Sequence, residues 1–256
     1  MTPRLTVDEI RERTYKRRDS WWTVWLVDPV AVHLVRLIAP WRWVTPNRLS
    51  LLAFGVGAGA AACFWTGWLI AGALLFHVAF LIDCLDGKIA RLNGTGSVFG
   101  VWLDYIFDRL RVVICALGLF GGQWQRTGDP LWIGLAGLVI FLDLFRYLNA
   151  LQMGKIRELM RGDGPEAADV HGDFRARFGL FGRARGFLLA HRIRAHVFSG
   201  IEFMMFVFVL GPLTGLVVPF TVVAAVLLTA FELLLIYKLW LTTRSYSTEK
   251  EALIRT

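Results

Sequence analysis

Four aspartates lie close together in a part of the sequence that is otherwise apolar: Asp83, Asp86, Asp104 and Asp108. The first two are three residues apart and the last two are four apart, so on two helices each pair would lie on one face, one turn apart. An ionised carboxylate in hydrocarbon costs about 2.5–3.5 kcal/mol on insertion scales. These acids therefore need partners that compensate their charge.

Basic side chains are one kind of partner, and Lys88, Arg91 and Arg109 are near in the sequence. Arg109 is adjacent to Asp108 and points about 100° away from it on a helix, so those two pair poorly. Cations are the other kind, since clustered carboxylates without Cys or His suit Mg²⁺ or Mn²⁺ better than zinc or copper. Two ions roughly 3.5–4 Å apart are the natural arrangement, and such a pair can clamp a phosphoryl group during transfer. Both kinds of partner stay open at this point.

The elements that carry these acids are typical of a membrane protein. The chain has 256 residues, 56% of them hydrophobic, with 11 Trp, 19 Phe and a mean hydropathy of +0.53. An ordinary globular domain is less apolar. Six stretches approach the ~20 residues that a bilayer needs: 49–69, 70–90, 99–120, 131–150, 197–213 and 217–240. We predict an all-α integral membrane protein with six transmembrane helices.

Residues 21–40 form a further apolar segment that precedes the six spans. A polar stripe runs along it, formed by Asp28, Pro29, His33 and Arg36. An amphipathic helix lying flat at the membrane interface suits this pattern better than a span. We therefore predict an N-terminal interfacial helix.

Charge placement predicts the orientation. With six spans and both termini inside, the segment 151–196 is cytosolic and holds Lys155 and eight arginines, whereas the outer loop 121–130 has only Arg126. An extra span at 21–40 would export those charges, against the positive-inside bias. The acids therefore face the cytosol. The predicted parts are a cytosolic tail with the interfacial helix at 1–44, a transmembrane catalytic domain at 45–240 and a cytosolic tail at 241–256.

Net charge and cysteines narrow the function classes. The formal charge of +8 could indicate a nucleic-acid partner, but few residues remain for a soluble basic domain once the apolar stretches are removed. Anionic membrane lipids or an anionic substrate are therefore expected rather than nucleic acid. The spacing of Cys63, Cys84 and Cys115 indicates neither a disulfide nor a zinc site. Residues 1–20 are too polar and acidic for a cleaved signal peptide, so the first span is expected to anchor the chain.

Small residues accompany the acids. Gly87 follows the second aspartate, Ala90 lies one turn further on, and Gly100 lies one turn before Asp104. Each alone is explained equally well by tight helix packing in a membrane. Their shared position beside the acids favours space left for a ligand.

The complete pattern is Asp-x-x-Asp-Gly-x-x-Ala-Arg over residues 83–91, then eight residues, then Gly-x-x-x-Asp-x-x-x-Asp over 100–108. It resembles the signature of the CDP-alcohol phosphotransferases, with no position missing. The six-helix layout with a preceding interfacial helix is also similar to that family, so the resemblance covers roughly residues 20–240. It implies transfer of a substituted phosphoryl group from a CDP-linked donor to an alcohol, with release of CMP.

The resemblance also implies roles for the acids. Asp83, Asp86 and Asp104 would be ligands of two Mg²⁺ or Mn²⁺ ions. Asp108 would be a further ligand or the general base that takes the proton of the acceptor hydroxyl. A homodimer is the family expectation.

The residues expected at the donor are, by the same resemblance, Thr45, Pro46, Asn47, Gly87, Ala90, Arg91 and Gly100. Arg91 would contact the donor phosphates, and Gly87 and Ala90 would leave room for the cytidine. The Thr-Pro-Asn stretch matches one that often opens the first span of the family and would belong to the nucleotide pocket.

The acceptor site is less defined by the sequence. Asp143 and Arg146 are three residues apart and could form a local ion pair, or Arg146 could bind a phosphate or hydroxyl of the acceptor. Glu202 and Glu232 could pair with basic residues of this region. Similar candidates for the acceptor at the start of the fifth span are Arg192, Arg194 and His196.

The segment 151–196 holds acids that could be drawn as a metal site, namely Asp163, Asp169, His171 and Asp173. A solvated loop uses the same residues, and no ligand spacing stands out. Anionic headgroups are the expected contacts of its arginines, which are Arg175, Arg177, Arg183 and Arg185.

Three functions stay in competition. The first is a phosphatidyltransferase that moves a phosphatidyl group from CDP-diacylglycerol to a small polar alcohol. The second reverses the roles, with a soluble CDP-alcohol donating to a lipid hydroxyl. The third is a metal-ion transporter, although transport sites lie near the midplane and often in repeated halves, and no repeat is visible here. Inositol phosphate, glycerol phosphate and serine are among the acceptors left open, and Arg109 is left without a role.

Overall fold

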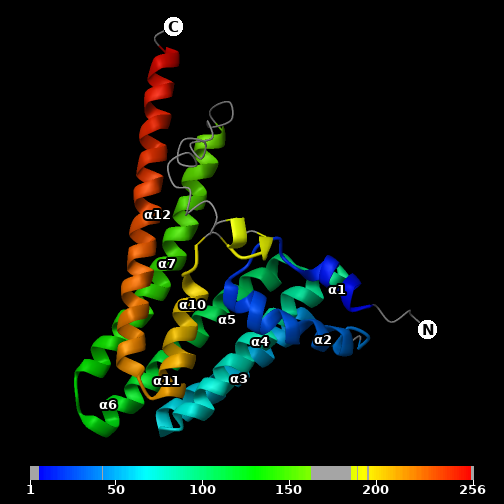
Figure 1. Cartoon of the computed structure of the whole chain (residues 1–256), viewed down its shortest axis with the longest axis vertical. Helices are drawn as coiled ribbons and strands as arrows, with labels where there is room; N and C mark the ends of the chain where they lie inside the picture. The colour runs from blue at the N-terminus through cyan, green and yellow to red at the C-terminus, as the bar shows by residue number, and fades with distance from the viewer. Residues whose placement is uncertain (1–5, 42, 163–185, 189, 195, 255–256) are drawn as a thin grey trace.

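A computed structural model gives the architecture of the protein, and it describes residues 6–41, 43–162, 186–188, 190–194 and 196–254. These residues form a bundle of helices (Figure 1). They contain no strand, although an isolated parallel bridge joins Asp19 to Ile193. The prediction of an all-α fold is confirmed for this part of the chain.

The N-terminal region contains one helix that the sequence analysis did not predict. Helix α1 (Val7–Thr14) begins with a capping box, in which the Thr6 hydroxyl accepts from the Glu9 amide and the Glu9 carboxylate accepts from the Thr6 amide. Its side chain at Ile10 is fully buried. The capping box and the buried face therefore stabilise a helix in this polar segment of eight residues, whose composition alone does not predict one.

The helix predicted at 21–40 is present. A π-helical turn, η1 (Thr23–Val27), leads into α2 (Asp28–Ile38), which carries Pro29 in its first turn. Residues of this segment also leave large apolar side chains exposed, among them Trp25, Leu26, Val30 and Leu37.

Helices α3 (Pro46–Thr66) and α4 (Leu69–Asn93) lie side by side and form a hairpin (Figure 1). The Thr45 hydroxyl caps α3 by accepting from the amide of Arg48. The turn between the helices uses Gly67 at φ +89°, a left-handed conformation that favours glycine. Small residues on the buried face of α3 let its neighbours approach closely, namely Ala53, Gly57 and Ala60.

The third predicted span extends further than expected. Helix α5 (Val98–Ala116) continues through the π-helical turn η2 (Leu117–Gly121) into α6 (Gly122–Thr127). The prediction of a loop at 121–130 is therefore wrong over most of its length, because residues 121–127 are helical. A π-helical turn absorbs an extra residue without ending the helix, so polar residues after the apolar run stay helical.

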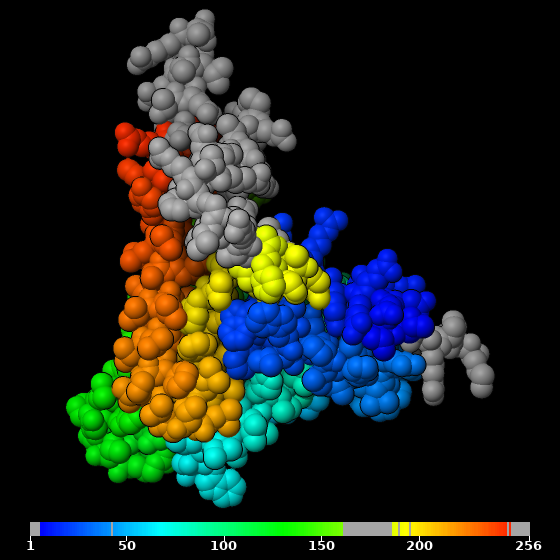
Figure 2. Space-filling view, in the orientation of Figure 1, coloured from blue at the N-terminus to red at the C-terminus, as the bar shows by residue number. Residues whose placement is uncertain are grey.

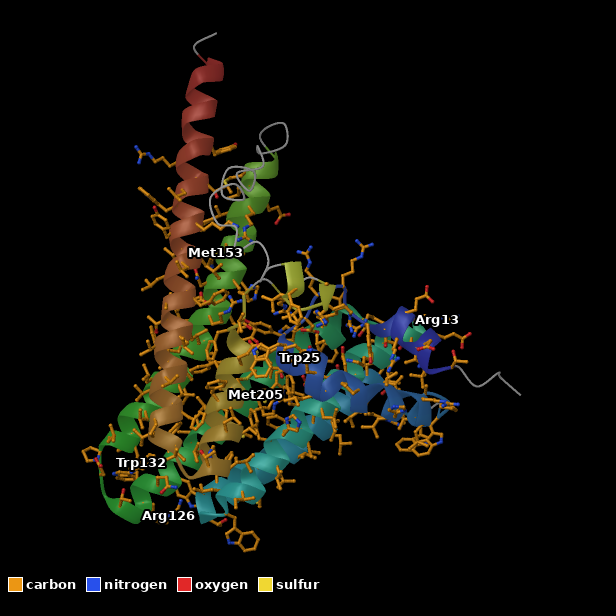
Figure 3. The ribbon with its side chains drawn as sticks, viewed as in Figure 1. Arg13, Trp25, Arg126, Trp132, Met153 and Met205 are labelled. Atoms are coloured by element: carbon orange, nitrogen blue, oxygen red, sulfur yellow. The ribbon has the colours of Figure 1, made fainter. Side chains whose placement is uncertain are left out.

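Helix α6 packs against the end of α3. A Cβ atom added at Gly122 would lie 2.7 Å from the carbonyl oxygen of Trp65, so only glycine permits this approach. The Arg126 guanidinium donates to the same carbonyl at 2.8 Å and so satisfies a backbone group that the end of α3 leaves free. Figure 3 shows Arg126 at this end of the bundle, with Trp132 of the next helix nearby.

The second half of the chain contributes three more long elements. They are α7 (Leu131–Gly162), the interrupted helix formed by α10 (Gly200–Met205), η3 (Phe206–Leu210) and α11 (Gly211–Thr214), and finally α12 (Val217–Ile254). Helices α7 and α12 run side by side (Figure 1). Because no Gly or Pro follows Pro219 before residue 254, α12 continues through most of the predicted tail at 241–256.

Four helices of the described chain are long and apolar enough to cross a membrane: Pro46–Thr66, Leu69–Asn93, Leu131–Met160 and Val217–Arg244. In the most apolar part of each helix, between 28% and 39% of the residues are buried inside the protein. Most of the remaining residues are therefore free to face lipid. Helix α5 is not among them because it carries four charged residues, and the Gly200–Thr214 segment is short. The structure thus shows four candidate spans of the six predicted.

The contact at Gly122 generates a stability prediction. We expect Gly122→Ala to destabilise the protein by about 1–3 kcal/mol, because the new methyl group overpacks against the backbone of α3. Thermal unfolding of the detergent-solubilised protein measures this as a lower Tm. Gly134→Ala in α7 is the matched control, since a Cβ there meets nothing within 4 Å and should leave the Tm equal or higher. Equal Tm values for both variants would contradict the close approach of α6 to α3.

Candidate active site

The structure brings the carboxylates of two consecutive helices together. Asp83 lies on α4, and Asp104 and Asp108 lie on α5. One carboxylate oxygen from each of these three residues lies within 4.8 Å of the others. Three of the four acids singled out in the sequence therefore form one cluster in space.

Asp86 lies beside this cluster and is held by the first span. The Ser50 hydroxyl of α3 donates a hydrogen bond of 2.5 Å to Oδ2 of Asp86. Both side chains are buried. Ser50 was not identified from the sequence, although its place four residues after Pro46 puts it one turn into α3, on the side that faces α4.

A cleft of about 590 Å³ opens over the acids. Its lining includes all four aspartates together with Gly87, Ala90, Arg91, Arg146, Tyr147, Arg194, Ser199, Gly200 and Met204. A smaller pocket of about 90 Å³ shares Asp86, Gly87, Ala90 and Asp104 with the cleft. The two spaces therefore adjoin at α4 and α5, with α3 lining the smaller pocket and α7 and α10 lining the cleft.

Most residues predicted for the donor line this site. The smaller pocket is lined by Pro46, Asn47, Gly87, Ala90 and Gly100, and Arg91 lines the cleft. Thr45 is in neither lining, and its hydroxyl caps α3. Arg91 also donates from Nε to the carbonyl oxygen of Thr14 at 2.7 Å, which ties α1 to the motif.

The two motif glycines differ in what they do. A Cβ at Gly100 would lie 2.9 Å from Oδ1 of Asn47, so this glycine permits close packing between α5 and the start of α3. A Cβ at Gly87 would meet only the Arg91 guanidinium, at 3.3 Å. Gly87 therefore keeps space in front of a basic group, whereas Gly100 serves packing.

Arg111 is a site residue that the sequence analysis missed. Its side chain is 2% exposed and forms ion pairs with two of the acids, with Nη1 lying 3.2 Å from Oδ1 of Asp83 and Nη2 bonded to Oδ1 of Asp108. The available signal was its position three residues after Asp108, on the same helix face. Arg111 is therefore a shared basic partner of Asp83 and Asp108.

The other bases of the region have their nearest acidic partners outside the cluster. The Arg109 guanidinium is bonded to Asp143, lies 3.4 Å from the centroid of the Tyr147 ring and is 3.7 Å from Oδ2 of Asp108. Lys88 forms a buried ion pair with Asp28 at 2.8 Å. Arg109, which had no predicted role, thus joins α5 to α7 behind the acids.

Of the two alternatives left open for Arg146, the local ion pair with Asp143 is not formed. Asp143 faces α5 and binds Arg109, whereas Arg146 faces α12, where its Nε lies 3.0 Å from Oε1 of Glu232. Three residues along α7 turn the side chain toward a different neighbour. Of the two glutamates that the sequence left undecided, Glu232 pairs with a base, whereas Glu202 accepts from the Ser199 hydroxyl at 2.7 Å.

The candidate acceptor residues separate into two groups. Arg146 and Arg194 line the cleft, and Arg194 lies 3.3 Å from Oδ1 of Asp19. Arg192 is absent from the lining because it binds Asp28 at 3.2 Å, so it anchors its segment to the N-terminal region. Figure 2 shows this segment, in yellow, against the blue N-terminal helices.

Burial, with Arg194 and Arg146 nearby, lowers the pKa of the His196 imidazole to about 4, so the ring is neutral at pH 7.

The loop residues that could be drawn as a metal site, and the arginines expected at lipid headgroups, all lie outside the described residues: Asp163, Asp169, His171, Asp173, Arg175, Arg177, Arg183 and Arg185.

The chemistry of the donor set at the cluster fits a hard divalent cation. Only carboxylate oxygens come together there, and three of them are close enough to bind a shared ion. Mg²⁺ and Mn²⁺ both prefer such ligands.

Comparison with known proteins identifies the family. A family model described as CDP-alcohol phosphatidyltransferase matches residues 43–243. The chain belongs to the CDP-alcohol phosphatidyltransferase family. The match includes α3, α4 and α5, which carry every acid of the cluster.

Individual members of the family match shorter parts of the chain. Phosphatidylinositol phosphate synthase of Corynebacterium glutamicum is 38% identical over 86 residues, which are 33% of this chain and 37% of that protein. Archaetidylinositol phosphate synthase of Methanothermobacter thermautotrophicus is 35% identical over 114 residues, 44% of this chain and 54% of that protein. The chain thus spans between 37% and 54% of the length of these two relatives. The crystal structure of Mycobacterium tuberculosis phosphatidylinositol phosphate synthase with CDP-DAG bound superposes with a TM-score of 0.44 at 21% identity, covering 84% of this chain and 94% of that one.

The buried pair behind the acids generates a prediction for this CDP-alcohol phosphatidyltransferase. We expect Asp143→Asn to lower stability by about 3–5 kcal/mol, because it leaves the buried Arg109 charge with only the longer 3.7 Å contact to Asp108. The double variant Arg109→Met, Asp143→Leu should recover most of that loss. Thermal unfolding in detergent measures both, with the exposed Asp8→Asn as control. A wild-type Tm for Asp143→Asn would show that the pair carries no stability.

Proposed function

We propose that this protein transfers a phosphatidyl group from CDP-diacylglycerol to the hydroxyl of a phosphorylated polyol and releases CMP. The observation that carries the proposal is the cluster of Asp83, Asp104 and Asp108 within 4.8 Å, in a cleft lined by Gly87 and Arg91 of the family motif. Clustered carboxylates beside a basic side chain suit an anionic, metal-bound diphosphate better than a neutral ligand.

Divalent cations belong to the proposal. Mg²⁺ or Mn²⁺, two ions in our proposal, would be held by Asp83, Asp86, Asp104 and Asp108. When bound, such ions offset the negative charge that develops on the donor diphosphate as CMP leaves.

Asp108 is the proposed general base. Its side chain is 23% exposed, compared with 14% for Asp83, so it is the more accessible of the two acids that pair with Arg111. In the transfer, the acceptor oxygen bonds to the phosphorus that carries the diacylglycerol, and the bond from that phosphorus to the CMP oxygen breaks. The acceptor proton passes to a carboxylate oxygen of Asp108.

The donor and acceptor would occupy different parts of the site. Arg91 would bind the donor phosphates, and the pocket at Asn47, Gly87 and Gly100 would take the nucleotide. Arg146 and Arg194 lie on the α7 and α10 side of the cleft, where their charge would attract a phosphate on the acceptor. The two relatives described above are named phosphatidylinositol phosphate synthase and archaetidylinositol phosphate synthase, so inositol phosphate is our first candidate for the acceptor.

We also propose six membrane spans, with α5 to α6 and Gly200–Thr214 added to the four apolar helices. Buried Arg109 and Arg111 turn the charge of α5 into the protein, while Trp102, Leu110 and Leu117 are exposed on its surface. Exposed tryptophans Trp25, Trp41 and Trp43 support an interfacial position for the segment before α3.

The positive-inside bias supports a site and termini on the cytosolic face of the cell membrane, with basic residues of 151–196 against anionic lipids. The homodimer expected from the family stays a prediction, which the mass of the protein in detergent would test.

Two alternatives make different predictions. A soluble CDP-alcohol as donor and a lipid hydroxyl as acceptor would use the same acids. A metal-ion transporter would need no nucleotide at all.

The direct test is CMP release by the purified protein. We expect release from CDP-diacylglycerol only when a matching alcohol and Mg²⁺ or Mn²⁺ are both present, and loss of release when EDTA removes the metal. The acceptor panel holds inositol 1-phosphate, glycerol 3-phosphate and serine, and a parallel panel pairs a soluble CDP-alcohol with diacylglycerol. If no CMP is released in either panel and the protein moves metal ions into liposomes, the enzyme proposal is wrong and the transporter alternative is supported.

Substitution of the proposed base tests its role. Asp108→Asn should lower kcat by about 10²- to 10⁴-fold, the usual contribution of a general base, while binding of CDP-diacylglycerol stays measurable. Asp129→Asn is the matched control, since Asp129 lies in the exposed turn before α7 and only caps that helix. Near-normal turnover in Asp108→Asn would remove Asp108 from the chemistry.

A further inference from the structure

Arg111 places a full positive charge inside the acid cluster. Its two terminal nitrogens bind Asp83 and Asp108, one from each helix of the acid pairs. It touches no open part of the cleft and is absent from its lining. Its charge therefore acts on the carboxylates and not directly on a substrate.

The side chain of Arg111 is fixed by the first span. A Cβ atom added at Gly57 of α3 would lie 2.8 Å from both Cγ and Cδ of Arg111. The Cys115 thiol, one turn further along α5, donates to the Gly57 carbonyl oxygen at 3.4 Å. The alkyl chain thus lies in a space that only glycine leaves open, so the guanidinium cannot withdraw easily when cations arrive.

This fixed charge changes the charge balance of the site. Asp83, Asp86, Asp104 and Asp108 carry −4 when ionised, and Arg111 brings the total to −3. One divalent ion then leaves −1, and a second ion would leave +1. Arg109 also lies 3.7 Å from Oδ2 of Asp108, but it is bonded to Asp143, so the Arg109–Asp143 pair adds no net charge to this sum. The first ion is therefore strongly attracted, whereas the second meets a site that is nearly neutral before it binds.

We propose that Arg111 makes the second divalent cation bind together with the CDP-linked donor. The diphosphate of the donor is anionic and supplies the negative charge that the second ion requires. In the free protein one ion is held tightly, and the site is completed only when donor is present. Arg111 is a positioning residue in this scheme. The inference rests on the proposed function, since it takes the metals and the donor from there.

The test is a titration of the detergent-solubilised protein with Mn²⁺, in which the EPR signal of the free ion reports binding. No acceptor is added, so no turnover occurs. We expect the wild-type protein to bind one Mn²⁺ tightly, and CDP-diacylglycerol to tighten the second by about 5- to 150-fold, the usual range of coupling between sites. In Arg111→Met the second ion should bind tightly without donor, and the coupling should fall towards one.

Matched variants separate charge from packing. Methionine keeps the alkyl contact with Gly57, and Arg111→Lys keeps the charge, so the lysine variant should retain the donor dependence. Gly57→Ala displaces the intact side chain and should weaken the coupling even if Arg111→Met fails to fold. Size-exclusion profiles confirm that each variant is folded.

Two results would overturn the inference. One is tight binding of two Mn²⁺ ions, or of none, by the wild-type protein without donor. The other is an unchanged second-ion affinity in Arg111→Met and Gly57→Ala. The Mn²⁺ titrations made without donor give the same result whichever donor the protein uses. Failure of the proposed function would appear separately, as absence of CMP release.

Discussion

The requirement that four carboxylates lie together within a bundle of apolar helices determines most of the other features of this protein. Charge in a low-dielectric region must be matched nearby, or the fold is lost. The structure matches it in layers: Arg111 binds two of the acids, Ser50 donates to a third, and Arg109 approaches the cluster from behind with its own partner in α7. Divalent cations would complete the compensation on the open side.

Helix α3 holds no acid, yet it sets the geometry of the site. Gly57 leaves the space for the Arg111 side chain, Ser50 orients Asp86, and Asn47 fits against Gly100 at the start of α5. Each of these contacts depends on a small residue that lets two helix backbones approach. The hairpin of α3 and α4 with α5 is therefore the rigid unit on which the chemistry depends, and loss of any of these contacts would shift the carboxylates relative to one another.

The remaining elements close the site from its two sides. Lys88 and Arg192 both bind Asp28, so the N-terminal segment is held to the motif helix and to the segment before α10. On the other side α7 and α12 bring Arg146 to the cleft and keep it there through Glu232. The donor motif and the candidate acceptor residues come from parts of the chain that the sequence separates widely.

The sequence by itself determined the helical class, the family motif and the helical pairing of the acids, because these depend on local period and spacing. It also indicated the helix at 21–40. It did not determine which buried charges pair, so Arg111 was missed and Arg146 was considered as a partner of Asp143 where the structure has Arg109. Ion pairing between helices depends on rotation about each helix axis and on which helices are neighbours. Those quantities arise only from tertiary packing, in which a glycine on one helix decides where an arginine on another can lie.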